Sequence, residues 1–213
     1  MSTRQIDFCF DLISPYAHVA LARLGELPAD VTVRPVPVLL GAILSHWGQR
    51  GPAEISAKRL HTYRQSVFLG LQHGVEMRFP PRHPFNPLKA LRLLAGADAD
   101  LAMVRTAFGF VFEQGRAPDT DDELAAFAEL IGVPLSLAQD DAAKAALRAN
   151  TDQAIGRGVF GVPTFVCPTG AGHEVFWGVD GFDMLLAWLS DPALFARAPY
   201  AHLGDVTIGI ERK

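Results

Sequence analysis

The alternation of apolar and polar positions divides the chain into strand-like and helix-like segments. Four short apolar runs are typical of buried strands: Ile6–Phe10, Val31–Val36, Val159–Cys167 and His173–Gly178. Gly170 and Gly172 lie between the last two runs, so these runs predict a β-hairpin. Residues from about 40 to 145 show helical spacing and no strand pattern. The sequence therefore predicts an α/β protein with a long helical insertion.

Helical spacing and capping residues predict where the helices begin and end. The expected helices span residues 15–27, 53–73, 87–95, 98–115, 120–132, 140–158 and 182–189. Thr120 to Glu123 has the pattern of a capping box, and Gly74 is expected just after a helix. Residues 47–52 and 79–87 are rich in glycine or proline and predict loops. Residues 205–210 predict a short strand whose place in the fold is not assigned.

The order of these elements is strand, helix, strand, helical insertion, helix, hairpin and closing helix. This order predicts a thioredoxin-like fold with a large inserted all-helical module. We expect residues 1–38 and 146–213 to form the two parts of the thioredoxin-like unit, and residues 39–145 to form the module. Pro163 begins a predicted core strand although it has no N–H to donate. A cis Val162–Pro163 bond would leave the N–H and C=O of Val162 free to pair with an extended peptide.

Ser14 joins the first strand to the first helix. Serine is favoured at the N-cap and proline at the first helical position, so Ser14-Pro15 predicts a helix start that faces the end of the strand. Such a helix end favours an anion by roughly 0.3–1 kcal/mol, and by up to about 2 kcal/mol when partly buried. A thiolate is an anion of this kind. On composition alone, the alternative that Ser14 is a helix cap and nothing more stays open beside the anion site.

Composition and charge narrow the class of protein. The chain has 213 residues, a net charge of −4 and 49% hydrophobic residues, as an ordinary soluble globule has. Because no basic run and no apolar stretch of about 20 residues occurs, we expect neither a nucleic-acid nor a membrane partner. Cys9 and Cys167 both fall in predicted strands, which argues against a redox pair or a zinc site. With no signal peptide in the pattern, the cytosol is the expected compartment.

Four motifs together carry a resemblance to a known family. These are Phe10–Ala17 (FDLISPYA), Phe79–Arg82 (FPPR), Gly161–Phe165 (GVPTF) and Phe176–Asp180 (FWGVD). The chain resembles 2-hydroxychromene-2-carboxylate isomerases over about residues 6–190. These enzymes are related to kappa-class glutathione transferases and to helix-inserted thiol–disulfide oxidoreductases. The resemblance implies glutathione as cofactor, a small aromatic acid as substrate, no metal, and a homodimer.

The resemblance also implies roles for individual residues. The glutathione sulfur would lie beside Ser14, its backbone would pair with Val162 next to Pro163, and its γ-glutamyl end would lie near Asp180 and Gly181. Ser14 would stabilise the thiolate rather than act as the nucleophile. The thiolate would add to a conjugated carbon, the bond would rotate, and elimination would release the trans product.

The substrate-binding candidates depart from the family pattern. The family's lysine for the substrate carboxylate is absent, Gln49 stands in place of an asparagine, and Gly181 stands where arginine or serine is common. Arg50, His46 or Arg82 is therefore expected to supply the cation. The full set of substrate-binding candidates is Tyr16, His46, Gln49, Arg50, Arg82 and Phe85.

Other functional classes remain open beside the isomerase. A kappa-like glutathione transferase would use the same site for another electrophilic substrate. A dithiol oxidoreductase is disfavoured because Ser14 and Ala17 occupy the two positions where its cysteines would stand. A binding protein without a dithiol would keep the groove beside Pro163 and carry out no reaction.

Overall fold

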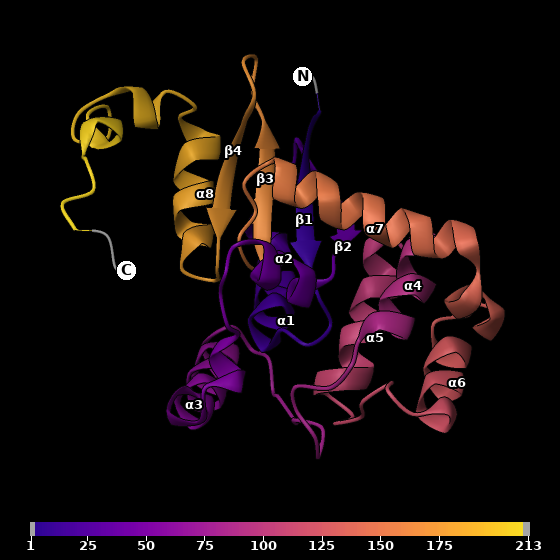
Figure 1. Ribbon diagram of the computed structural model, residues 1–213. Helices are drawn as coiled ribbons and strands as arrows, with labels where there is room; N and C mark the ends of the chain where they lie inside the picture. The colour runs from indigo at the N-terminus through magenta and orange to yellow at the C-terminus, as the bar shows by residue number, and fades with distance from the viewer. Residues whose placement is uncertain (1–2, 211–213) are drawn as a thin grey trace.

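The computed structural model describes residues 3–210 and is built around a four-stranded mixed sheet (Figure 1). The strands are β1 (Arg4–Phe10), β2 (Val31–Pro37), β3 (Thr164–Pro168) and β4 (His173–Trp177). Their order across the sheet is β2-β1-β3-β4, with β1 parallel to β2 and the other neighbours antiparallel. Phe8 faces Phe165 in this register, so the hairpin pairs directly with the first strand. The predicted βαβ unit and hairpin are both present.

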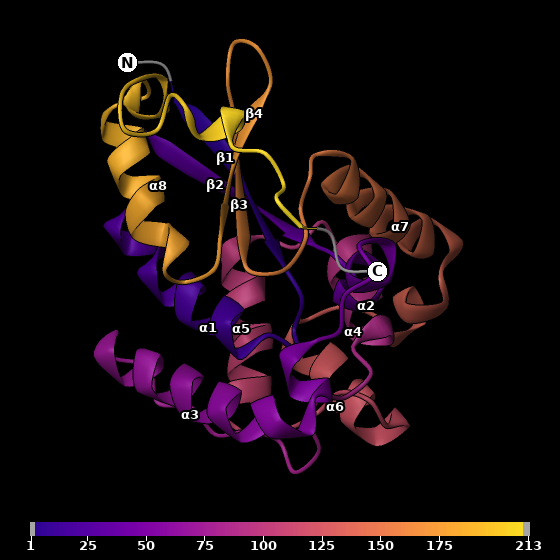
Figure 2. The same cartoon turned by 60° about the vertical axis from the view of Figure 1, so that its left-hand side comes forward.

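Eight α-helices cover the sheet and extend beyond it within the described residues. They are α1 (Pro15–Ala22), α2 (Leu40–His46), α3 (Ser56–Gln72), α4 (Leu88–Gly96), α5 (Leu101–Phe112), α6 (Asp121–Leu130), α7 (Asp141–Gly156) and α8 (Gly181–Ser190). Figure 2 shows α1 and α8 on one side of the sheet and α7 on the other. Helices α3, α5 and α6 lie beyond the carboxyl end of β1, the end from which Ser14 follows (Figure 1). The helical segment between β2 and β3 therefore reaches the loop that follows β1.

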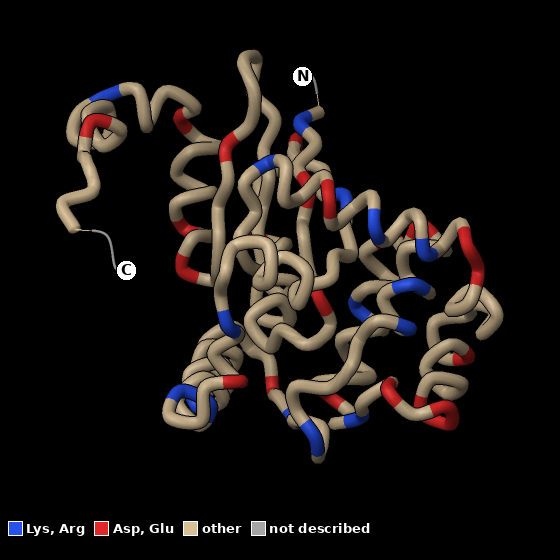
Figure 3. Tube along the Cα trace, in the orientation of Figure 1, with Lys and Arg blue, Asp and Glu red and all other residues tan. Residues whose placement is uncertain are grey.

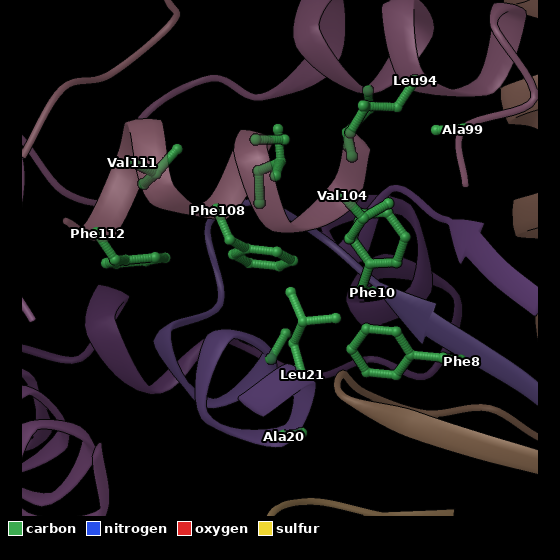
Figure 4. Packing of buried hydrophobic residues seen from close by; sticks show 14 of the residues in the cluster. Phe8, Phe10, Ala20, Leu21, Leu94, Ala99, Val104, Phe108, Val111 and Phe112 are labelled. Atoms are coloured by element: carbon green, nitrogen blue, oxygen red, sulfur yellow. The ribbon is translucent and has the colours of Figure 1, made fainter. Parts of the chain in front are cut away.

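The two faces of the sheet have separate cores because side chains alternate along β1. Phe8 and Phe10 point to the α1 side, where Phe8 stacks on Phe165 at 5.1 Å and Phe10 packs against Phe108 at 5.6 Å between ring centroids. Figure 4 shows Phe8 and Phe10 of β1 together with residues of α5, among them Phe108. Cys9 points to the other face and belongs to a smaller cluster with Ala154 of α7. The first strand is thus buried on both sides, as its continuous apolar run predicted.

Asp7 is the charged residue that ties α7 to the sheet. Its carboxylate accepts hydrogen bonds from Arg34 and from Arg157, the residue that ends α7, at 2.7 Å each. Burial acts to raise the pKa of Asp7, but the two arginines outweigh it and hold the pKa below its ordinary value. The charge inside the predicted strand is therefore paired.

The helix boundaries correct several predictions. Helix α1 ends at Ala22 and gives way to a 3₁₀ turn at Arg23–Glu26, instead of continuing to residue 27. Helix α5 begins at Leu101 and not at residue 98, because the Asp100 side chain caps it by accepting the Met103 N–H at 2.8 Å.

Capping residues elsewhere agree with the sequence only in part. The Thr120 hydroxyl accepts the Glu123 N–H at 3.4 Å, but the Glu123 carboxylate pairs with Arg116, so only half of the capping box forms. Gly74 has φ +73°, as a residue just after a helix requires, and this prediction is confirmed.

Two strand predictions were wrong: one strand begins later than predicted, and the other does not form. Strand β3 begins at Thr164 rather than at residue 159, since Pro163 has no N–H for the ladder. Residues 205–210 form no strand; a 3₁₀ turn at Leu203–Asp205 is followed by exposed residues. These tail residues have no neighbouring strand to pair with. Cys9 and Cys167 are buried free thiols, and burial raises the pKa of each to about 12.

Charged residues are distributed over the surface rather than gathered in one region. Figure 3 shows Lys and Arg interspersed with Asp and Glu along the trace. Within residues 3–210, no helix has both the length and the apolar character that crossing a bilayer requires.

Candidate functional site

Ser14 lies where the first strand meets the first helix, and its hydroxyl has partners from two parts of the chain. Its backbone is extended, and its Oγ accepts the Ala17 N–H at 3.2 Å, as an N-cap does. The same Oγ donates to the Val162 carbonyl oxygen at 3.4 Å, across 148 residues of sequence. Only 5% of Ser14 is exposed. The structure therefore brings together two residues that the sequence assigned to one binding site.

Val162 agrees with the sequence prediction except at its carbonyl oxygen. The Val162–Pro163 bond is cis. The Val162 carbonyl is not free, because it accepts the Ser14 hydroxyl. The N–H of Val162 has no acceptor within residues 3–210. An extended ligand beside this residue would find one unpaired donor, and a carbonyl held by a single long hydrogen bond.

The first turn of α1 also leaves a donor unpaired. Pro15 has no N–H, and the Ala17 N–H is taken by the Ser14 side chain. In the part of the chain that the structure describes, the Tyr16 N–H has no acceptor. A helix start with an unpaired amide and a hydroxyl beside it suits a bound anion.

Asp11 supports the turn that leads to Ser14, and the sequence analysis did not single it out. Its two carboxylate oxygens accept the Ile13 N–H at 3.1 Å and the Leu40 N–H at 2.9 Å. Burial raises the pKa of the Asp11 carboxyl to about 7, although both N–H donors oppose this rise. One carboxylate thus joins the Ser14 turn to the start of α2. A lone acidic residue at the end of an apolar run was the available signal.

His83 is a second residue that the sequence analysis missed. One ring nitrogen lies 2.7 Å from the Ile13 carbonyl oxygen, and the other lies 3.0 Å from the Tyr63 hydroxyl. The Tyr63 hydroxyl also donates to the His83 carbonyl at 2.8 Å. Phe79 and Phe85 approach the imidazole edge-on. Burial lowers the pKa of His83, so this imidazole is neutral at pH 7.

His18, one helical turn after Ser14, takes no part in a relay. Its ring packs nearly parallel to the rings of both Phe108 and Phe112, at 5.7 Å from each, and these two rings are 6.3 Å apart. Neither ring nitrogen has a hydrogen-bond partner in the structure. Burial lowers the pKa of His18 to about 4, so the ring is uncharged at neutral pH. Ser14 therefore has no histidine base within reach from its own helix.

The predicted γ-glutamyl subsite lies at the start of α8. Asp180 is the N-cap residue of this helix and Gly181 is its first residue. The Gly178 N–H donates to the Pro163 carbonyl at 2.9 Å, so this turn lies next to the segment that contacts Ser14. Arg23 donates to the Val179 carbonyl at 3.1 Å, which joins the end of α1 to the same turn.

The substrate-binding candidates do not share one environment. The Tyr16 hydroxyl donates to the Gln65 side chain of α3 at 2.8 Å, and burial raises its pKa, with a further contribution from Asp180. Arg82 pairs with Asp119 at 3.0 Å, so this cation is already bound. Phe85 is buried against His83.

The other three candidates lie in or next to the exposed loop after α2. Trp47 anchors this loop by donating its indole N–H to the Val159 carbonyl at 2.9 Å. Val159 is close to Val162 in the sequence. His46 meets the Trp47 ring edge-on. Gln49 and Arg50 are exposed, and Arg50 has no ion-pair partner within the described range. Two cavities of about 660 and 580 Å³ lie elsewhere, and neither is lined by Ser14.

Comparisons with known proteins agree with this architecture. The DSBA-like thioredoxin domain model matches residues 5–190. A 2-hydroxychromene-2-carboxylate isomerase of Pseudomonas putida is 30% identical over 189 residues, covering 84% of this chain and 91% of that protein. Glutathione S-transferase kappa 1 of Caenorhabditis elegans is 24% identical over 207 residues, covering 88% and 92%. A solved 2-hydroxychromene-2-carboxylate isomerase structure, 25% identical, superposes with a TM-score of 0.75 over 89% of this chain and 96% of that chain. The predicted thioredoxin-like fold with inserted helices is confirmed.

Proposed function

Since the chain belongs to the DSBA-like thioredoxin domain family and, within it, to the 2-hydroxychromene-2-carboxylate isomerases, we propose that it is a glutathione-dependent cis–trans isomerase of an aromatic acid. The observation that carries this proposal is the position of Ser14. Its hydroxyl lies at the start of α1, 3.4 Å from the Val162 carbonyl. The N–H groups of Tyr16 and Val162, near it in the chain and in the fold, have no acceptor among residues 3–210. These groups fit a thiol peptide that lies between α1 and the segment before β3.

Ser14 acts as a hydrogen-bond donor to the sulfur. Its bond to Val162 is at the long end of the normal range, so little is lost when the hydroxyl turns toward a sulfur anion. The Tyr16 N–H and the helix dipole add to the same stabilisation. Together they lower the pKa of a thiol held there, as they do for protein cysteines at helix starts. Ser14 forms no covalent bond itself.

The groups that surround the glutathione sulfur also bind the rest of this tripeptide. The Val162 N–H pairs with a backbone carbonyl of the peptide, and Asp180 pairs with its α-ammonium group. The Gly181 N–H at the start of α8 receives its α-carboxylate, whereas the next N–H, of Phe182, already donates to the Val179 carbonyl at 3.3 Å. When bound, glutathione supplies a thiol that adds to the substrate and leaves again, so that a former double bond can rotate in between.

The substrate carboxylate needs a cation on the open side of Ser14. Arg82 is held by Asp119, whereas Arg50 is exposed and unpaired within residues 3–210. Arg50 is therefore the best replacement for the absent family lysine. His46 and Gln49 flank it in the same region, and Tyr16 and Phe85 complete the candidate lining. The predicted homodimer, cytoplasmic location and domain boundaries stay predictions.

The experiment measures isomerisation of 2-hydroxychromene-2-carboxylate by absorbance, with and without glutathione. We expect turnover that depends on glutathione, and its loss in Ser14→Ala. Ser190→Ala, which removes an exposed hydroxyl at the end of α8, serves as the matched control. Unchanged turnover without glutathione would remove the proposal.

A kappa-like transferase is the second candidate, because the family lysine is absent while the Ser14 groups are kept. It predicts conjugation of glutathione to 1-chloro-2,4-dinitrobenzene without isomerisation of the chromene acid. Binding of glutathione with neither reaction would favour a protein that binds and does not catalyse.

A further inference from the structure

The peptide bond between Ile13 and Ser14 is held by hydrogen bonds at both ends. The Ser14 N–H donates to the Asp11 carbonyl at 3.0 Å. The Ile13 carbonyl accepts from the His83 ring at 2.7 Å, and the Ile13 N–H donates to the Asp11 side chain at 3.1 Å. Rotation of this peptide plane changes φ of Ser14 and moves its side chain. The first two bonds hold this peptide plane and the Ile13 N–H bond holds the peptide before it, so the three together fix where the Ser14 hydroxyl lies.

Of these three bonds, the one from His83 comes from far away in sequence. Asp11 belongs to the same tight turn as Ile13, whereas His83 is 70 residues later, in the proline-rich loop before α4. This loop lies within the inserted helical segment. The His83 contact is thus a direct link between the insertion and the turn that presents Ser14.

The neighbours of His83 fix the tautomer of its imidazole. A backbone carbonyl can only accept, so the ring nitrogen facing Ile13, Nε2, carries the hydrogen. The ring is neutral, so Nδ1 has a lone pair and accepts from the Tyr63 hydroxyl at 3.0 Å. Tyr63 shares its hydrogen with the His83 carbonyl at 2.8 Å, which holds the loop backbone as well. The ring therefore donates to Ile13 through Nε2, while Nδ1 and the His83 carbonyl oxygen share the one hydroxyl hydrogen of Tyr63.

We propose that His83 is a positioning residue for Ser14, acting through the Ile13 carbonyl, with Tyr63 holding its ring in the required tautomer and orientation. This inference rests on the proposed function, because it assigns His83 a role in placing the hydroxyl that stabilises the thiolate. His83 does not contact Ser14 directly. Loss of its hydrogen bond frees the Ile13–Ser14 peptide to rotate, so the hydroxyl spends less time in the productive geometry.

The variants compare the presence and the absence of a donor at this position. His83→Gln retains an amide N–H that can reach the place of Nε2, whereas His83→Leu fills similar space without a donor. We expect His83→Leu to lower kcat by about tenfold to a hundredfold, the range for misplacement of a catalytic group. KM for glutathione should change by less than about threefold, because the Val162 and Asp180 contacts are untouched. His83→Gln should recover most of kcat.

Two further variants separate positioning from general damage. Tyr63→Phe removes the partner of Nδ1 and should give a smaller loss than His83→Leu. His61→Gln, an exposed histidine of α3, should leave both constants unchanged. Equal kcat in His83→Leu and His83→Gln, or a loss confined to KM, would overturn the proposal.

A readout that does not depend on catalysis separates this inference from the proposed function. In the unliganded protein, ¹⁵N NMR of the histidine rings should show His83 protonated at Nε2 alone. The ¹³C shift of the Ile13 carbonyl should move in His83→Leu and stay near the parent value in His83→Gln. An Nδ1-protonated ring, or a carbonyl shift that is the same in all three proteins, refutes the positioning role. Normal shifts with no glutathione-dependent turnover in the parent would refute the proposed function instead.

Discussion

Ser14 and His18 are one turn apart on α1 and equally buried, yet their polar atoms have opposite surroundings. They are 5% and 6% exposed. The Ser14 hydroxyl has two hydrogen-bond partners, one of them from the segment before β3, whereas both His18 nitrogens have none. His18 instead packs against two neighbouring phenylalanines, Phe108 and Phe112. The start of this helix thus has a polar group joined to another part of the chain, and its next turn has a polar ring that packs against core phenylalanines and lines a cavity.

This difference shows that burial of a polar residue does not by itself mark a site. A buried polar atom without a partner costs about 1–3 kcal/mol, which the rest of the fold must offset. Ser14 avoids this cost and keeps a hydroxyl that can change partners. Arg23, at the other end of α1, is also 6% exposed, but it is fully paired with Glu26, Asp183 and the Val179 carbonyl. What separates these three residues is the set of partners that other segments supply.

The largest expected effect comes from removing the Ser14 hydroxyl. Ser14→Ala should lower glutathione-dependent kcat/KM by a factor of about 10² to 10³, as the loss of one donor to a reacting anion does. The free energy of unfolding should fall by only about 1 kcal/mol, the usual cost of a lost N-cap. Steady-state kinetics and urea unfolding measure the two effects. A large loss of stability with little change in kcat/KM would make Ser14 a structural cap only.

The next effect comes from Arg23, whose charge is paired at the end of α1. Arg23→Met keeps much of the packing over the Phe182 ring, 4.4 Å from the guanidinium, but loses the hydrogen bonds. The free energy of unfolding should fall by about 2 kcal/mol, since hydrogen bonds to charged groups contribute roughly 1.5–3 kcal/mol. KM for glutathione should rise more than kcat falls, because the bond to Val179 holds the turn before Asp180. Arg64→Met, at an exposed position of α3, is the matched control for loss of a charge.

The smallest effect concerns His18 and appears as a pH dependence. The pKa of His18 is lowered to about 4, against about 6.5 in an unfolded chain, so the unfolded state binds more protons between these values. Stability should therefore fall as pH falls from about 6.5 to 4, by up to roughly 1.4 kcal/mol per pH unit. His18→Phe, which keeps an aromatic ring packed against Phe108 and Phe112, should lack this dependence.

The comparison of the two proteins removes the contribution of other groups. Asp11, with its pKa raised to about 7, makes stability fall as pH rises from about 4 to 7, and this acts in the parent and in His18→Phe alike. The difference in unfolding free energy between the two proteins should thus grow from pH 7 to pH 4. A difference that is constant over this range would show that His18 stays protonated or gains a partner.

Local chemistry made much of the fold predictable. Ser14-Pro15 marked the start of α1, Gly74 marked a helix end with positive φ, and the continuous apolar run of β1 indicated burial on both faces. Each of these features is decided by residues within a few positions of one another. Pro163 likewise indicated an interruption of regular strand pairing, because proline has no N–H to donate. The start of β3 was nevertheless predicted five residues too early.

The candidate site was predictable only where a motif named its residues. The motifs pointed to Ser14 and Val162, and the structure places them in contact. No residue near His83 in the sequence indicates that its ring contacts the Ile13 carbonyl. Likewise, no residue near Arg82 indicates that its guanidinium pairs with Asp119. The free Val162 carbonyl was wrongly predicted for the same reason, because its partner is 148 residues away.

The sequence by itself determined the elements, the inserted helical segment and the cap at the start of α1, since capping, alternation and proline geometry act over a few residues. The tertiary structure decided which polar groups are satisfied: the Ser14 hydroxyl by Val162, the Ile13 carbonyl by His83, and the His18 ring by nothing. Hydrogen bonds act over about 3 Å, so a partner distant in sequence becomes a partner only when the chain has folded.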